Sequence, residues 1–184
     1  MDRAFLDSAF LDYSAKTLRQ LGSRIETCLS SLNEDQVWAR GSENENAVGN
    51  LVLHLCGNVR QWIVSGAGGR PDSRDRDSEF SAKGGIPVTE LAGRLRAVVQ
   101  EAVAVLGEVT AERLGERIVV QEYDVTVLEA VYHVVEHFSM HTGQIIFITK
   151  MLTGSDLGFY RHLKQAAAAP AQAAGGHGGE QVTP

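Results

Sequence analysis

The sequence predicts an all-α protein, a four-helix bundle with a long polar loop between its second and third helices. Four stretches of about 18–30 residues repeat apolar side chains at the three- and four-residue spacing of amphipathic helices. No alternating pattern that would build a sheet lies between them. With 184 residues, of which 43% are hydrophobic, the chain is long enough to bury one core.

The first predicted helix covers residues 2–32 and the second covers residues 47–64. The first ends before Asn33, a helix-capping residue type, and a polar segment at residues 41–46 follows. The second helix is expected to stop at the glycine cluster of residues 66–69.

Residues 70–85 are polar and rich in turn formers, which predicts the long loop. Pro87 suits the first turn of the third helix. Residues 117–126 are expected to form a short extended excursion or hairpin, and the fourth helix is predicted over residues 127–152. The bundle domain is therefore assigned to residues 1–165, and the low-complexity Ala/Gly-rich segment at residues 166–184 is predicted to be a disordered tail.

Composition excludes several classes of function. The formal net charge is −6 and no basic patch occurs, which argues against nucleic-acid binding. No apolar run approaches the roughly 20 residues of a membrane-spanning helix. The N-terminus lacks the apolar region of a signal peptide, and there are only two cysteines, Cys28 and Cys56. We therefore expect a cytoplasmic protein without disulfides.

Three histidines form a stripe on the fourth predicted helix. His133, His137 and His141 are each four residues apart, so they lie within about 80° of one another around the helix. A pair four residues apart is the usual way for a helix to offer two imidazoles to one metal ion. His137 and His141 lie nearer the centre of the apolar face than His133, so they are the better candidate ligands.

A bundle metal site also needs a ligand from a facing helix. His54 flanks the apolar face of the second helix, with Asn50 and Asn58 one turn away on either side. Cys56 points roughly opposite to His54 and should not share the metal. A lone histidine beside an apolar face is more often a packed or solvent-edge residue. A solvated stripe on the fourth helix is the alternative, although its polar side lies elsewhere.

The segments NLVLHLCGNVRQW and HVVEHFSMHTGQI resemble the DinB/YfiT-like metalloenzyme superfamily, over roughly residues 1–165. The resemblance implies a four-helix bundle, often dimeric, with a divalent ion held by His54, His137 and His141. Characterised relatives include transferases and isomerases that use low-molecular-weight thiols. Thr142 stands where relatives often carry an arginine, so any contact of that arginine is not expected here.

The leading hypothesis is thus a metal-dependent enzyme of the thiol-dependent transferase type, with zinc, nickel or iron as cofactor. It would act on a small-molecule substrate, with a low-molecular-weight thiol as partner, in a homodimer. Arginines of the loop at residues 70–85 could meet an anionic cosubstrate. A non-enzymatic metal-binding stress-response protein is the second hypothesis. An interaction module is the third, with Leu53, Val64, Ile146 and Phe147 outside the main apolar faces.

Overall fold

The computed structural model of the chain describes residues 3–161 and residue 163. The boundary placed at residue 165 and the tail predicted for residues 166–184 lie outside the described residues.

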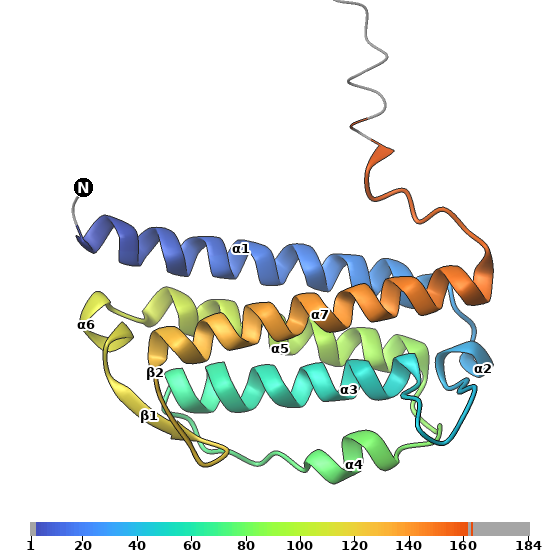
Figure 1. Ribbon diagram of the computed structural model, residues 1–184, viewed down its shortest axis with the longest axis horizontal. Coiled ribbons are helices and arrows are strands. Elements are labelled where there is room, and N and C mark those ends of the chain that lie inside the picture. The colour runs from blue at the N-terminus through green and yellow to red at the C-terminus, as the bar shows by residue number, and fades with distance from the viewer. Residues whose placement is uncertain (1–2, 162, 164–184) are drawn as a thin grey trace, which may run out of the picture.

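Four long helices lie side by side and form the body of the protein (Figure 1). They are α1 (Arg3–Ser30), α3 (Val48–Val59), α5 (Val88–Glu108) and α7 (Val127–Thr153), and α3 continues as a π-helical segment, η1 (Arg60–Ala67). The predicted four-helix architecture is confirmed.

The core lies between these four helices, on the stripes that the apolar periodicity predicted. Its largest fully buried side chains come from each of them and include Leu18, Ile25, Leu55, Ile63, Leu91, Leu95, Phe138 and Ile145. Burying one such side chain is worth about 1.5–3 kcal/mol, so packing rather than helix propensity holds the bundle together. In the described part of the chain, no helix combines the length and apolar character that crossing a membrane requires.

Local signals fix both ends of α7, the helix that carries the histidine stripe. Thr126 and Glu129 form a capping box, in which the Thr126 hydroxyl accepts from the Glu129 amide and the Glu129 carboxylate accepts from the Thr126 amide. Gly154 ends the helix in the left-handed conformation, with φ of 65°. These caps set where α7 begins and ends.

The remaining short elements close the ends of the bundle. The predicted hairpin at residues 117–126 is present as β1 (Arg117–Val120) paired with β2 (Tyr123–Thr126) in antiparallel register. Two short helices, α2 (Glu34–Val37) and α6 (Ala111–Leu114), bridge α1 to α3 and α5 to β1.

The long connection between α3 and α5 contains a helix that the sequence did not predict. This is α4 (Arg76–Ser81), which begins where the Asp75 side chain accepts a hydrogen bond from the Ser78 amide. It packs against α3 on the outside of the four-helix body (Figure 1). The connection is therefore partly ordered by helix capping and covers the helix that carries His54.

Candidate metal centre

The structure brings His54, His137 and His141 together between α3 and α7. One ring nitrogen from each lies within 4.8 Å of the other two. His54 Nε2 is 2.9 Å from His137 Nε2, although these residues are 83 positions apart in the sequence. Two of the rings come from one face of α7, one turn apart, and the third comes from the helix beside it. We call these three residues the histidine cluster.

The cluster sits at the edge of the core. His54 is 6% exposed and His141 is 9% exposed, whereas His137 is half-buried and forms the more accessible side. His133 lies beside the cluster and not within it, as the helical wheel indicated. Its ring stacks on His137 with 5.3 Å between centroids, it packs against Trp62 with 4.3 Å between centroids, and its Nε2 lies 3.5 Å from Asn58 Nδ2.

Hydrogen bonds on the outer side orient two of the three rings. His141 Nδ1 lies 2.7 Å from Gln144 Oε1, an acceptor, so this nitrogen carries the proton and Nε2 keeps its lone pair. His54 Nδ1 lies 3.0 Å from a carboxylate oxygen of Glu79. An imidazole that is oriented through its outer nitrogen and keeps its inner nitrogen unprotonated is a ligand type that zinc, nickel and iron accept. The residues present therefore fit a divalent transition-metal ion.

Burial keeps the α7 histidines neutral. Desolvation lowers the pKa of His133 and of His141, and it lowers the pKa of His137 to about 3 together with the nearby rings of His141 and His54. A neutral imidazole is the form that binds a metal, so at pH 7 an ion competes with few protons for these rings.

The same shifts predict acid sensitivity of the metal-free protein. A histidine in the unfolded chain has a pKa of about 6.5, whereas the pKa of folded His137 is lowered to about 3. Between these values the unfolded chain binds a proton at His137 and the folded chain does not. Stability should therefore fall as the pH drops from about 6.5 toward 5, before the carboxylates titrate. We expect a lower Tm at pH 5 than at pH 7, and a smaller difference in His137→Gln. Equal Tm values at the two pH values in the native chain would contradict this.

A buried ion pair covers the outer side of His54. Arg74 Nε donates to Glu79 Oε1 at 2.7 Å, and Arg74 Nη2 donates to Glu79 Oε2 at 2.8 Å. The two side chains are 2% and 8% exposed. Burial alone would raise the pKa of Glu79, but the hydrogen bonds from Arg74 and His54 outweigh it, so the pKa lies below its ordinary value. Arg74 is thus paired with Glu79, and the expectation that arginines of this loop meet an anionic cosubstrate stays a prediction.

Several other residues singled out in the sequence have structural roles. The Asn50 side chain donates to the backbone carbonyls of Glu79 and Ala82 and is not one of the histidine cluster's donors. Val64 is buried, so it does not belong to an exposed face that could bind a partner. The homodimer stays a prediction.

Cys56 lies outside the histidine cluster, as predicted. Burial raises the pKa of its thiol to about 12, which disfavours the thiolate that a metal would need. Neither cysteine is in a disulfide.

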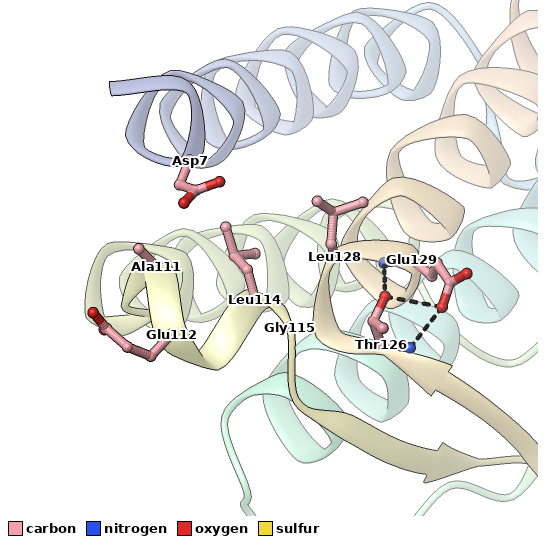
Figure 2. Close-up of a pocket in the computed structure, with 8 residues that line it drawn as sticks. All are labelled: Asp7, Ala111, Glu112, Leu114, Gly115, Thr126, Leu128 and Glu129. Atoms are coloured by element: carbon pink, nitrogen blue, oxygen red, sulfur yellow. Dashed lines mark hydrogen bonds between the residues drawn. The ribbon is translucent and has the colours of Figure 1, made fainter. Parts of the chain in front are cut away.

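The structure also has a surface hollow of about 580 Å³ between α1, α6 and the first turn of α7. Figure 2 shows its lining, with Asp7 on one side and the bonded pair Thr126 and Glu129 on the other. No histidine lines it. Its polar groups on α7 are already used to cap the helix, so we do not assign a function to it.

Together, the fold and the histidine cluster define a helical-bundle protein with a three-histidine site that could hold a metal ion. Its family follows from the sequence comparison, in which residues 6–162 match the family described as "Protein of unknown function (DUF1572)". The chain belongs to this family. A search among curated proteins gives no match.

Solved structures share the fold. A conserved protein from Enterococcus faecalis is similar with a TM-score of 0.67 and 17% sequence identity, over 78% of this chain and 97% of that one. A DinB-like protein from Bacillus cereus is similar with a TM-score of 0.59 and 15% identity, over 72% of this chain and 85% of that one. At these identities the likeness shows the fold alone, and the fold is DinB-like.

Proposed function

We propose that this protein binds a divalent transition-metal ion through His54, His137 and His141, and that it is a metal-dependent enzyme of the thiol-dependent transferase type. The main observation behind this proposal is the set of donor atoms. Three imidazole nitrogens converge, and among the described residues no fourth histidine, cysteine or carboxylate joins them. Structural zinc sites usually have four protein ligands, whereas catalytic sites have three and leave a position for water or substrate.

The partial exposure of one side of the histidine cluster supports the hypothesis that the protein is an enzyme. His54 and His141 are buried against the core, while His137 and its stacked neighbour His133 are half-buried. A small molecule could therefore approach from the side of His137 and His133 without opening the bundle. A bound divalent ion would supply Lewis acidity that lowers the pKa of a thiol or water at the open position.

The residues of the chain would bind the ion and orient its ligands. His54, His137 and His141 hold the ion, and Gln144 fixes the ring of His141 through its Nδ1 proton. Burial lowers the pKa of His133, so at pH 7 this ring is neutral and can accept a hydrogen bond from a bound molecule or donate one to it. The thiol as cosubstrate follows from the resemblance of the two histidine segments to thiol-dependent enzymes.

A cobalt-substituted sample tests the thiol. Three neutral imidazoles leave the charge of the ion uncompensated, so an anionic sulfur is a favourable extra ligand. We expect a sulfur-to-cobalt charge-transfer band in the near-ultraviolet spectrum when 2-mercaptoethanol is added. The band should be absent in His137→Ala and present in Cys56→Ser, because the sulfur comes from the added thiol.

The cobalt content together with the spectral response to thiols distinguishes a thiol-dependent enzyme from other metal-binding proteins. If the protein holds one cobalt per chain and thiols cause no spectral change, the thiol-transferase proposal fails. A metal-bound protein without a thiol reaction, including a non-enzymatic metal-binding protein, would then be the better account.

A further inference from the structure

The outer nitrogen of His54 has two neighbours that require opposite protonation states. Glu79 Oε2, an acceptor, lies 3.0 Å from Nδ1, and Arg74 Nη2, a donor, lies 3.1 Å from it. If Nδ1 carries the proton, it donates to Glu79. If Nδ1 is bare, it accepts from Arg74 and the proton sits on Nε2, where it points at His137. Only the first tautomer offers the Nε2 lone pair to an ion.

Charge decides between these neighbours. A carboxylate is the stronger hydrogen-bond partner for an N–H. Arg74 also lies closer to Glu79, at 2.7 and 2.8 Å, than to His54 Nδ1, at 3.1 Å. Because Arg74 balances its charge, Glu79 stays ionised although it is only 6% exposed. Both oxygens of Glu79 accept from Arg74, and the carboxylate faces Nδ1 of His54, the nitrogen that points away from the histidine cluster. Glu79 is therefore not itself a metal ligand.

The position of Glu79 is fixed from its own backbone. Asn50 Nδ2 donates to the carbonyls of Glu79 and Ala82, both at 2.9 Å. Arg40 Nη2 donates to Ala82 O and to Asn50 Oδ1, both at 2.7 Å. The end of α4 is thus tied to α3 next to His54.

A glycine on α3 makes room for the ion pair. A Cβ at Gly57 would lie 1.8 Å from Glu79 Oε1 and 2.8 Å from Arg74 Nε. Any side chain at this position would push the carboxylate away from His54. Four separate features of the chain therefore serve this one contact: the Arg74 pair, the Asn50 clamp, the α4 helix and the bare backbone at residue 57.

We propose that Glu79, held by Arg74, is a positioning residue: it accepts the Nδ1 proton of His54 and so sets the tautomer that turns Nε2 toward the metal. The proposal rests on the metal site of the proposed function, but it does not need an ion to be present. Protein groups alone make this contact, so the proposal can be tested in metal-free protein.

The direct test is the tautomer of His54 in the metal-free protein, read from a long-range ¹H–¹⁵N correlation spectrum. We expect the proton on Nδ1 in the native chain and on Nε2 in Glu79→Gln. The amide has a single acceptor oxygen for the two N–H groups of Arg74 that the carboxylate binds, so Arg74 Nη2 donates to His54 Nδ1 instead. The matched control is Asp77→Asn, an exposed carboxylate on the same helix, which should keep the native tautomer. A proton on Nε2 in the native metal-free chain would overturn the proposal.

Zinc affinity, measured by competition with a chromophoric chelator, is the second readout. Loss of an outer hydrogen bond to a metal ligand typically weakens binding 10–100-fold, and we expect a loss of about this size in Glu79→Gln and none in Asp77→Asn. Gly57→Ala should give a similar loss by displacing an unaltered carboxylate. If the native chain binds no zinc, the proposed metal site fails while the tautomer still tests Glu79. If Glu79→Gln binds zinc as tightly as the native chain, Glu79 is not the positioning residue.

Discussion

Substitution of His137 by alanine is expected to remove tight metal binding. His137 Nε2 lies 2.9 Å from His54 Nε2, and loss of this ring leaves only His54 and His141 in the histidine cluster. Two imidazoles cannot complete a typical protein zinc site. The affinity should therefore fall by more than the roughly 10–100-fold that an outer hydrogen bond contributes. Isothermal titration with zinc measures this.

His133→Ala is the matched control. This residue lies on the same helix face and stacks on His137, but its nitrogens do not join the histidine cluster. We expect it to weaken zinc binding only modestly. If His133→Ala abolished binding and His137→Ala or His141→Ala retained it, the ligand set would be wrong.

Truncation of Phe138 should have the largest effect on stability. Its ring is completely buried on the core side of α7, directly after His137 in the sequence. Removing a buried phenylalanine ring typically costs about 3–5 kcal/mol of unfolding free energy, because contacts are lost and a cavity remains. For a domain of this size we expect Phe138→Ala to lower Tm by roughly 6–20 °C.

Phe147 on the same helix gives the comparison. It is 64% exposed, so Phe147→Ala should change the unfolding free energy by about 0.5 kcal/mol or less. Denaturant unfolding of the two variants measures both effects. Equal losses in the two would mean that Phe138 does not anchor α7 to the core.

The helices could be predicted because their signals are local. The apolar periodicity of residues 127–152 and the glycine at position 154 contain enough information to place α7 within a residue at its ends. The short helix α4 was not predicted, since a six-residue helix is too short for periodicity to be visible. Its one local signal is Asp75 with Ser78 three residues later, the positions joined by the capping hydrogen bond.

The residues of the site likewise fall into those that local spacing predicts and those that depend on tertiary packing. Histidines four residues apart on one helix can be found from spacing alone, and the structure places His54 opposite them as the second helix suggested. Glu79 and Arg74 could not be found, because charged residues in a polar segment are usually solvated. Their burial depends on the packing of α4 against α3. Gly57, a residue without a side chain within a regular helix, was the one sign that something approaches closely there.

The separation of the histidines along the chain links metal supply to folding. His137 and His141 are one helical turn apart and can meet on α7 alone, whereas His54 is 83 residues before His137 and arrives only when α3 docks on α7. An ion shared by all three would be a cross-link between distant segments, and the unfolded chain has no equivalent site. Mass action then draws the chain toward its folded form as free metal rises. The ion would act as a ligand of the tertiary structure as well as of the imidazoles.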